Sequence, residues 1–502
     1  MGSAHLCETV TGGTMTGLLA ARDAATAGDM VELRLDGVAG LDVAGALHGR
    51  RKPAVVTCRA AWEGGRFDGT DEERRRIVAR ALEAGAEYVD VEWRALQASH
   101  AGSDAAAAAW AALVATAPDR VVLSAHDFSG VPPDLDGQVR SMRASGAGVI
   151  KVAYAAARLT DTLPLRGIAA AGRAVVIGMG DAGLPSRLLA SRYGSLWTYG
   201  GNAVAPGQIP AAQMIDRYRF RQVGPATRLF GVVSRTARHS LSPVIHNRAF
   251  AAAGLDAVYV PLQAEAFDEF LAYAEAMGLE GASVTVPFKL DALRAASRRD
   301  PLSEAVGAAN TLRRRDGGWE ATNTDVDGFL SPLGDAFPAG LSGVRATVLG
   351  GGGSARAVVL ALRSKGAVVS VCARRAEQAD EVARALGART APWPPAPGSW
   401  DLLVNCTPLG GAHLRGASPL PGGPFGGRLV YDLTYGPGES ALVREARQAG
   451  CAALDGLAML VAQAERQFAW WTGQPPRARV MDEAARAAVT PDGNGSGAEA
   501  PR

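Results

Sequence analysis

Short apolar runs rich in Val, Ile and Leu alternate with longer amphipathic segments over the first 222 residues. Such runs are typical of parallel strands buried on both faces, and the segments between them are long enough to form helices. Eight strands are predicted here: His5–Val10, Met30–Leu35, Ala54–Cys58, Tyr88–Glu92, Val121–Ala125, Val149–Ala153, Ala174–Gly178 and Leu196–Tyr199. Eight strands that alternate with helices predict an α/β fold whose first domain, residues 1–222, is a (β/α)8 barrel.

A second α/β pattern begins after residues 218–228, a segment with Gly and Pro that we interpret as a linker. The strand Gly343–Leu349 is followed by the glycine turn Gly350–Arg356, the helix Ala357–Ser364 and the strand Ala367–Cys372. This order predicts a Rossmann-type dinucleotide-binding domain, which we place at residues 329–455. The last residues, 490–502, are expected to form a disordered tail.

Composition narrows the function classes. The chain has 502 residues, of which 48% are hydrophobic and 20% charged, as in ordinary globular proteins. Its net charge of +2 comes without a long basic stripe, so we expect neither nucleic acid nor a membrane as a partner. The five cysteines show no C-x-x-C spacing, which argues against disulfides and a zinc site. With no signal peptide and no membrane span, a cytoplasmic protein without a metal is expected.

Only four of the 52 basic residues are lysines: Lys52, Lys151, Lys289 and Lys365. An arginine stays protonated in a protein, whereas a buried amine can lose its proton and act as a nucleophile. Lys151 lies inside the apolar run 148–154, where burial favours the neutral amine. We therefore expect Lys151 to form a Schiff base with a ketone.

Polar residues at the ends of the predicted barrel strands surround this lysine. His126 ends the strand before it and has the side chain of a general base, and Glu92 is expected to orient the imidazole. Arg34, Arg59 and Arg187 are candidates for binding an anionic substrate. A single histidine at a strand end is more often structural, but the combination favours an active site at the C-terminal end of the barrel.

The first half resembles type I 3-dehydroquinate dehydratases. The resemblance covers about residues 5 to 215 and is carried by Glu32–Asp36, Thr57–Arg59, Glu63–Phe67, Tyr88–Glu92, Ser124–Phe128, Ile150–Val152, Met179–Arg187 and Ala205–Gln208. It implies dehydration of 3-dehydroquinate to 3-dehydroshikimate through an imine on Lys151. His126 is then the acid and base, and Glu92 its orienting partner. The implied substrate contacts are Glu32, Arg34, Arg59, Arg187 and Gln208. Val204 stands where the family usually has Ser or Thr.

The second half carries signs of a nicotinamide reductase. Gly350, Gly352 and Gly353 form a turn between a strand and a helix, where backbone N–H groups can approach a pyrophosphate. Arg374 and Arg375 follow the next strand, where NAD enzymes carry an acidic residue, so they favour NADP over NAD. The alternative is a solvated arginine pair.

An amine and a carboxylate complete the chemistry of this half. Lys289 follows a Thr-Val-Pro-Phe turn, and Asp325 lies some 35 residues later. Such a pair suits proton transfer to an oxygen when a hydride adds to a carbonyl carbon.

These motifs resemble shikimate dehydrogenases over about residues 228 to 475. The resemblance is carried by His239–Asn247, Val284–Lys289, Gly307–Thr311, Asn323–Asp325, Gly350–Ala357, Asn405–Pro408, Tyr431–Tyr435 and Gly456–Gln463. It implies a substrate-binding lobe at 228–328, joined by a returning helix at 456–475, with Lys289 and Asp325 as the catalytic pair. The implied shikimate contacts are Ser240, Ser242, Thr285, Asn310, Tyr435 and Gln463. The implied cofactor contacts are Gly350, Gly352, Gly353, Ser354, Ala355, Arg374, Arg375, Thr407 and Gly456. Ser283 stands where the family usually has Asn.

Because the product of the first reaction is the substrate of the second, we expect a bifunctional lyase and NADP-dependent oxidoreductase. Its expected partners are 3-dehydroquinate, 3-dehydroshikimate and shikimate; its oligomeric state stays open. One alternative is a quinate/shikimate dehydrogenase with relaxed substrate or cofactor choice in the second half. Another is an inactive binding or scaffolding protein, against which the presence of Lys151, His126, Lys289 and Asp325 argues.

Overall fold

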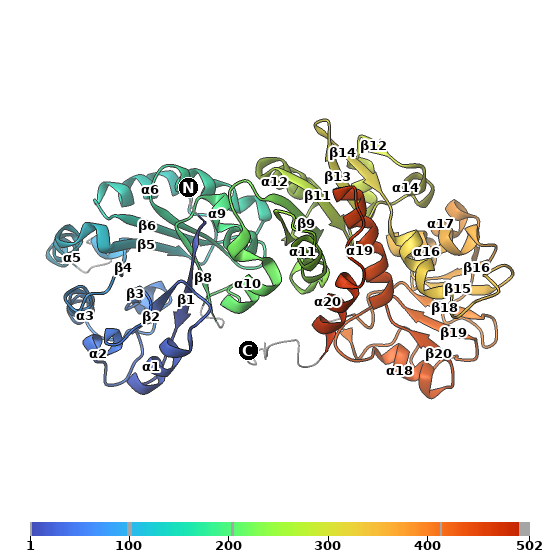
Figure 1. Ribbon diagram of the computed structural model, residues 1–502, viewed down its shortest axis with the longest axis horizontal. Coiled ribbons are helices and arrows are strands. Elements are labelled where there is room, and N and C mark those ends of the chain that lie inside the picture. The colour runs from blue at the N-terminus through green and yellow to red at the C-terminus, as the bar shows by residue number, and fades with distance from the viewer. Residues whose placement is uncertain (1–2, 98–102, 202–204, 412–413, 491–502) are drawn as a thin grey trace. The chain divides into compact units, whose positions relative to one another are not determined.

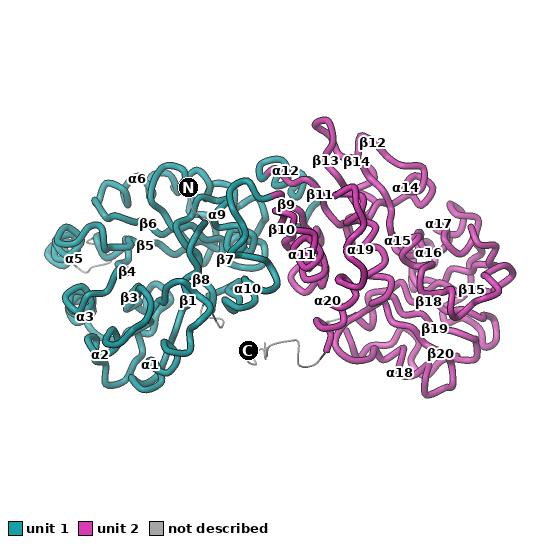
Figure 2. Tube along the Cα trace, viewed as in Figure 1, with its two compact units in different colours: residues 1–227, 262–277 teal, residues 228–261, 278–502 magenta. Residues whose placement is uncertain are grey.

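The computed structural model describes residues 3–97, 103–201, 205–411 and 414–490. Contacts divide the chain into two compact units, shown in different colours in Figure 2. The first, unit 1, comprises residues 1–227 and 262–277, and the second, unit 2, comprises residues 228–261 and 278–502. The predicted disordered tail falls almost entirely outside the described residues, as does Val204.

The barrel of unit 1 is built from eight parallel strands. They are β1 (His5–Val10), β2 (Met30–Arg34), β3 (Ala54–Thr57), β4 (Tyr88–Glu92), β5 (Val121–Asp127), β6 (Val149–Ala155), β7 (Ala174–Met179) and β8 (Trp197–Gly200). Their order is β7-β6-β5-β4-β3-β2-β1-β8, and β1 pairs with both β2 and β8. The Leu196 N–H donates to the Ala174 carbonyl at 2.9 Å and links the start of β8 to β7. The sheet is a nearly closed parallel barrel, which confirms the predicted fold class.

Helices surround the barrel strands (Figure 1). They are α1 (Met15–Ala24), α2 (Val43–Leu47), α3 (Asp71–Glu83), α5 (Asp104–Thr116), α6 (Leu135–Ala144), α7 (Pro164–Ala170), α8 (Leu184–Leu188), α9 (Ala190–Tyr193) and α10 (Ala211–Tyr218). Local sequence sets several of their ends. For example, the hydroxyl of Thr70 accepts from the Glu73 N–H while the Glu73 carboxylate accepts from the Thr70 N–H, so this capping box starts α3.

One helix from later in the chain belongs to unit 1. It is α12 (Phe267–Met277), which is coloured with the barrel in Figure 2. The buried carboxylate of Glu269 accepts from the Leu159 N–H at the start of the turn that follows β6. The hydroxyl of Tyr273 lies 3.3 Å from that of Tyr193 in α9. The sequence places residues 262–277 within the predicted lobe 228–328, whereas these contacts group them with residues 1–227.

Unit 2 contains a mixed sheet with the order β10-β9-β11-β13-β14-β12. Its strands are β9 (Arg228–Ser234), β10 (Ala257–Gln263), β11 (Leu279–Val284), β12 (Arg298–Arg299), β13 (Thr311–Arg315) and β14 (Gly318–Thr322). The helices of this lobe are α11 (Ser242–Ala252), α13 (Lys289–Ala295), α14 (Pro301–Val306) and α15 (Asp325–Leu330). Its core includes residues from α11 and from two C-terminal helices, α19 (Leu457–Thr472) and α20 (Val480–Val489).

The second sheet of unit 2 is parallel, with the order β17-β16-β15-β18-β19-β20. Its strands are β15 (Arg345–Leu349), β16 (Val368–Cys372), β17 (Arg389–Thr390), β18 (Leu402–Asn405), β19 (Leu429–Asp432) and β20 (Ala452–Leu454). The helices α16 (Gly353–Ser364), α17 (Ala376–Leu386) and α18 (Ala441–Gln448) connect these strands. The strand order reverses between β15 and β18, which is the topological switch point where α/β sheets bind nucleotides, and this order confirms the predicted Rossmann-type fold.

Candidate active sites

A cavity of about 220 Å³ lies at the C-terminal ends of the barrel strands. Its lining includes seven of the eight barrel residues proposed from the sequence, all except Glu92: Glu32, Arg34, Arg59, His126, Lys151, Arg187 and Gln208. Thr9, Glu63 and Tyr199, to which the sequence assigns no role, also line it. Side chains alternate along a strand, so Lys151 and Ala153 of β6 both face the cavity.

Lys151 is buried, and its Nζ lies 3.4 Å from Asp90 Oδ2 and 3.8 Å from Glu32 Oε1. The same nitrogen lies 4.4 Å from the centre of the Tyr199 ring. Although burial opposes it, the charges of Arg59 and Lys151 lower the pKa of Asp90. The lysine thus has an anionic partner on one side and an aromatic face on the other, which fixes the direction of its amine.

His126 pairs with Glu63. The imidazole Nδ1 lies 2.8 Å from Glu63 Oε1, and the backbone N–H of His126 donates to the same oxygen at 3.1 Å. A carboxyl group at Nδ1 fixes the ring tautomer and leaves Nε2 free for a substrate proton. Glu63 follows β3 in a short 3-10 turn, four residues after Arg59. Glu63 begins the stretch Glu63–Phe67 that carries the family resemblance, which was the available signal in the sequence for this residue.

The expected pairing of His126 with Glu92 is wrong in this structure. The Glu92 carboxylate accepts from the Ala60 N–H at 3.0 Å and lies 3.2 Å from the Arg59 guanidinium. Its other oxygen accepts from the buried Arg74 of α3. Both carboxylate oxygens of Glu92, at the end of β4, accept from these donors. Glu92 therefore links β4 to the turn after β3 and to α3, and it does not orient the imidazole.

Burial sets the protonation of the His126–Glu63 pair. Burial, and then the positive charges of Arg59 and Lys151, lower the pKa of His126 well below its usual value. Burial raises the pKa of Glu63 to about 8. Both shifts favour the uncharged pair, a neutral imidazole beside a protonated carboxyl group, over the imidazolium–carboxylate pair. The imidazole is therefore neutral at pH 7 and able to accept a proton.

The three arginines of the cavity differ in their partners. Arg34 forms two hydrogen bonds to Asp36, at 2.9 and 2.8 Å, and Arg59 donates to Asp90 at 2.8 Å. Arg187 contacts only the carbonyl oxygens of Tyr199 and Pro206 among the described residues, at 3.4 and 3.3 Å. Burial lowers the pKa of Arg187 to about 10. A buried guanidinium without a carboxylate is stabilised by an anionic ligand, so Arg187 suits a substrate carboxylate.

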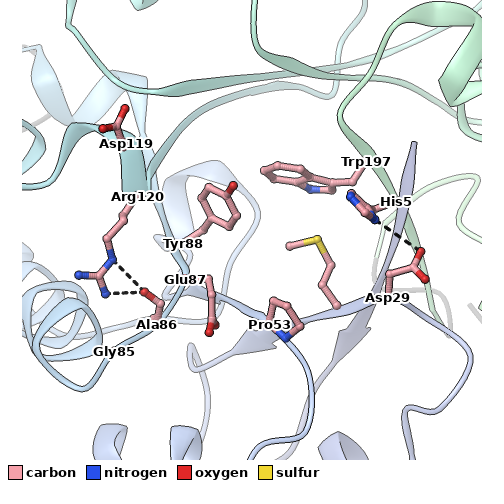
Figure 3. Close-up of a pocket in the computed structure, with 11 residues that line it drawn as sticks. His5, Asp29, Pro53, Gly85, Ala86, Glu87, Tyr88, Asp119, Arg120 and Trp197 are labelled. Atoms are coloured by element: carbon pink, nitrogen blue, oxygen red, sulfur yellow. Dashed lines mark hydrogen bonds and ion pairs between the residues drawn. The ribbon is translucent and has the colours of Figure 1, made fainter. Parts of the chain in front are cut away.

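A larger cavity, of about 840 Å³, opens at the opposite, N-terminal end of the strands (Figure 3). Its charged side chains are engaged within the protein: Arg120 donates to the Ala86 carbonyl, and His5 lies 4.0 Å from Asp29. Catalytic residues of such barrels come from the other end, and this end serves stability. We assign the chemistry of unit 1 to the smaller cavity.

The substrate cavity of unit 2 has a volume of about 160 Å³. It brings together all the predicted shikimate contacts and both members of the predicted catalytic pair: Ser240, Ser242, Thr285, Asn310, Tyr435, Gln463, Lys289 and Asp325. Ser354 and Gly456, which the sequence suggested as cofactor contacts, also line this cavity.

Lys289 and Asp325 form a buried ion pair. The Lys289 Nζ donates to Asp325 Oδ2 at 2.6 Å, and the Asn310 amide donates to Asp325 Oδ1 at 2.7 Å. Lys289 begins α13 and Asp325 begins α15, so two helix starts place the pair at the edge of the cavity. The arrangement can hold a proton on the amine and deliver it to an oxygen in the cavity.

Two polar side chains that the sequence did not single out, Tyr259 and Gln467, form hydrogen bonds to Ser283. The Tyr259 hydroxyl donates to Ser283 Oγ at 2.6 Å, and Ser283 Oγ donates to Gln467 Oε1 at 2.7 Å. Ser283 and Gln467 both line the cavity. The serine that departs from the family pattern is therefore a member of a hydrogen-bonded chain at the cavity wall.

The N-terminus of α16 offers the features that a dinucleotide needs. Its first helical turn follows Gly352, which makes no side-chain capping bond, so the N–H groups at this end are available to an anion. Gly350 has φ of +116°, which an L side chain rarely adopts, and a Cβ there would lie 3.5 Å from Thr407. Arg374 and Arg375 are exposed just after β16. The turn, Thr407 and the two arginines fit a pyrophosphate and a 2′-phosphate.

The described residues contain no group of three or more His, Cys, Asp or Glu side chains that could hold a metal ion. They also contain no helix that is long and apolar enough to cross a membrane.

Comparison with known proteins agrees with this geometry. Residues 6–225 match the family model for type I 3-dehydroquinase. Residues 232–312 match the model for the shikimate dehydrogenase substrate binding domain, and residues 456–486 match that for the shikimate 5'-dehydrogenase C-terminal domain. The fold and the two sites thus define a chain that joins a dehydroquinase barrel to a shikimate dehydrogenase.

Two relatives in sequence support the same assignment, and one solved structure is similar to the second half of the chain. The bifunctional 3-dehydroquinate dehydratase/shikimate dehydrogenase of Arabidopsis thaliana is 31% identical over 89% of this chain and 78% of its own length. The NADP(+) shikimate dehydrogenase of Hyphomonas neptunium is 40% identical over 50% of this chain and 93% of its own length. A crystal structure of the Thermus thermophilus shikimate 5-dehydrogenase with NADP(H) and shikimate is 34% identical, with a TM-score of 0.47, over 52% of this chain and all of that one. The chain belongs to the family of bifunctional 3-dehydroquinate dehydratase/shikimate dehydrogenases.

Proposed function

We propose that the chain catalyses two consecutive reactions, the dehydration of 3-dehydroquinate to 3-dehydroshikimate and the reduction of 3-dehydroshikimate to shikimate with NADPH. Lys151 with His126 and Glu63 supports the first reaction. Lys289 with Asp325, beside the open N-terminus of α16, supports the second. The single observation that carries the proposal is that the residues for both reactions gather in two separate cavities of one chain.

In the first reaction, Lys151 gives up its ammonium proton and attacks the ketone, and loss of water from the adduct gives an iminium. Arg187 binds the substrate carboxylate and fixes the ring over the lysine. The neutral His126 removes a proton from the carbon next to the iminium carbon, which is thereby made acidic. The protonated imidazole then gives its proton to the hydroxyl that leaves as water from the neighbouring carbon. Hydrolysis of the iminium releases 3-dehydroshikimate and frees Lys151.

In the second reaction, NADPH would supply the hydride when bound. Lys289 donates a proton to the carbonyl oxygen that becomes the new hydroxyl, and Asp325 holds the amine in place. Ser240, Ser242, Thr285 and Asn310 supply hydrogen-bonding groups for the ring substituents. The glycine turn and Thr407 would hold the cofactor, and Arg374 and Arg375 would select the 2′-phosphate.

Two single variants test both halves in one assay, in which 3-dehydroquinate and NADPH are supplied and nicotinamide absorbance is followed. The unchanged chain should oxidise NADPH after a lag. Lys151→Ala should oxidise NADPH only when 3-dehydroshikimate is supplied directly. Lys289→Ala should accumulate 3-dehydroshikimate, with a reductase kcat lower by about 10²-fold or more. If the unchanged chain turned over neither substrate, the proposal would be wrong.

The cellular setting is part of this proposal. All five cysteines are free thiols, and four of them are buried. Free thiols are the rule in reducing compartments, which supports work in the cytoplasm on small-molecule substrates.

A further inference from the structure

Ser354 lies against the catalytic lysine of the reductase. The Lys289 Nζ donates to Ser354 Oγ at 2.9 Å, at the same time as it donates to Asp325 Oδ2 at 2.6 Å. Ser354 is the second residue of α16, and it lines the substrate cavity together with Lys289 and Asp325. The sequence suggested a cofactor contact for this residue, whereas the structure shows its hydroxyl on the lysine.

An ammonium group has three N–H donors in a tetrahedral arrangement. One hydrogen bond leaves such a group free to turn about it, whereas two hydrogen bonds fix the direction of the third N–H. With Asp325 and Ser354 as the two acceptors, the third N–H is left for an oxygen in the cavity. The carboxylate of Asp325 alone balances the charge of the ammonium group. The distinct contribution of Ser354 is therefore to fix the orientation of its N–H groups.

The lysine stem packs against the same turn. A Cβ added at Gly353 would lie 3.0 Å from Lys289 Cβ and 3.1 Å from its Cδ. The side chain of Lys289 therefore runs along the start of α16, with its stem against Gly353 and its amine on Ser354. This turn is also the one with N–H groups available to a pyrophosphate. The proton donor and the cofactor turn are thus held in fixed relation.

We propose that Ser354 is a positioning residue for Lys289, and that its hydroxyl aims the lysine ammonium at the substrate oxygen from the turn that holds the cofactor. This inference rests on the proposed reductase function. It makes Ser354 a determinant of the rate of proton transfer and leaves the binding of shikimate and NADPH to other groups.

Ser354→Ala tests the proposal. The kcat of the reductase should fall by about 10-fold, since the amine keeps Asp325 but loses its second acceptor. The KM values for 3-dehydroshikimate and NADPH should change by less than about twofold. Ser354→Thr keeps a hydroxyl and should restore most of the rate. Ser354→Cys keeps the size but is a weaker acceptor, and should resemble the alanine variant.

Two controls separate positioning from a structural effect. Ser364 lies at the other end of α16, where its hydroxyl donates to the Ala361 carbonyl at 2.7 Å, so Ser364→Ala should leave the reductase kcat unchanged. The dehydratase activity of the same chain, which no residue of α16 serves, reports that each variant is folded and correctly quantified.

Three outcomes would overturn the proposal: a reductase kcat unchanged in Ser354→Ala, a loss confined to the KM for NADPH, or no recovery in Ser354→Thr. The second would make Ser354 a cofactor contact only. Absence of reductase activity in the unchanged chain would instead remove the proposed function, because the variant comparison then has no rate to change.

Discussion

The imidazole of His126 lies 2.8 Å from the carboxyl group of Glu63, and this pair is the acid–base centre that we propose for the barrel. Glu92, which lies closer to His126 along the sequence, is held by Arg59, Arg74 and the Ala60 N–H. Two buried glutamates within one barrel therefore have separate tasks. One positions a catalytic ring, and the other neutralises two buried guanidiniums.

Substituting the two glutamates should separate these tasks. Glu63→Gln should lower the dehydratase kcat by about 10- to 100-fold, because the imidazole loses a carboxyl group that fixes its tautomer and that, once ionised, stabilises its protonated form. Glu92→Gln should leave kcat nearer to normal but lower the free energy of unfolding by about 3 kcal/mol, the scale of a broken buried ion pair. Steady-state kinetics and thermal unfolding measure the two effects. The reverse pattern, with the larger kinetic loss in Glu92→Gln, would restore the pairing expected from the sequence.

Titration of His126 offers a direct check on the electrostatics. Burial and the nearby cations Arg59 and Lys151 destabilise the imidazolium, so the pKa of His126 lies well below the ordinary value of 6.5. The ring should therefore stay neutral as the pH is lowered through 6.5. NMR of histidine ring signals, with His126→Ala to assign the resonance, measures the midpoint. A midpoint at or above 6.5 would contradict the neutral base.

The imine step can be trapped chemically. Borohydride added with 3-dehydroquinate should reduce an iminium on Lys151 and inactivate the dehydratase irreversibly. Mass spectrometry of peptides should find the adduct on Lys151, and Lys151→Ala should give none while its reductase kinetics stay unchanged. Turnover without any adduct, or an adduct on another lysine, would exclude this mechanism.

Cofactor choice should depend on the exposed arginine after β16. Arg374→Asp should weaken NADPH binding by about 1.5–3 kcal/mol, because a charge-assisted contact to the 2′-phosphate becomes a repulsion. NADH binding, which involves no such phosphate, should change little. Arg384, exposed on α17, provides a matched control in Arg384→Asp. Equal losses for NADPH and NADH would mean that Arg374 is surface charge only.

Much of this molecule follows from its sequence, because the features concerned are local. Apolar runs and glycine spacing report backbone conformation directly. The sequence therefore predicts strand β4, Tyr88–Glu92, and the turn that carries Gly350. Lys151 and Lys289 were recognised because an amine in an apolar setting has few structural uses.

The contacts that could not be predicted are those between side chains on different helices, strands and turns. Glu63 and Glu92 both follow barrel strands, and only the path of the turn after β3 decides which one reaches His126. Ser354 sits in a motif associated with phosphates, yet its hydroxyl contacts a lysine from another helix. Choices of this kind are made by tertiary packing, on which periodicity and spacing carry no information.

Helix α12 belongs to unit 1, and we expect it to stabilise the barrel. The side chain of Tyr273 is fully buried, and its hydroxyl lies 3.3 Å from that of Tyr193, which in turn lies 2.8 Å from Thr162 Oγ1. A fragment of residues 1–227 keeps every residue that lines the barrel cavity but lacks α12. Removal of the helix takes the Tyr273 hydroxyl away from Tyr193. It also takes away the Glu269 carboxylate, to which the Leu159 N–H donates.

We therefore expect the 1–227 fragment to retain dehydratase activity and to unfold at a temperature several degrees below that of the barrel in the full chain. In the full chain, Tyr273→Phe removes only the hydroxyl and should cost about 1 kcal/mol, the scale of one hydrogen bond. Thermal unfolding monitored through dehydratase activity measures both. A fragment as stable as the full chain would show that α12 adds nothing to unit 1, and an inactive fragment would show that the helix is needed to form the site itself.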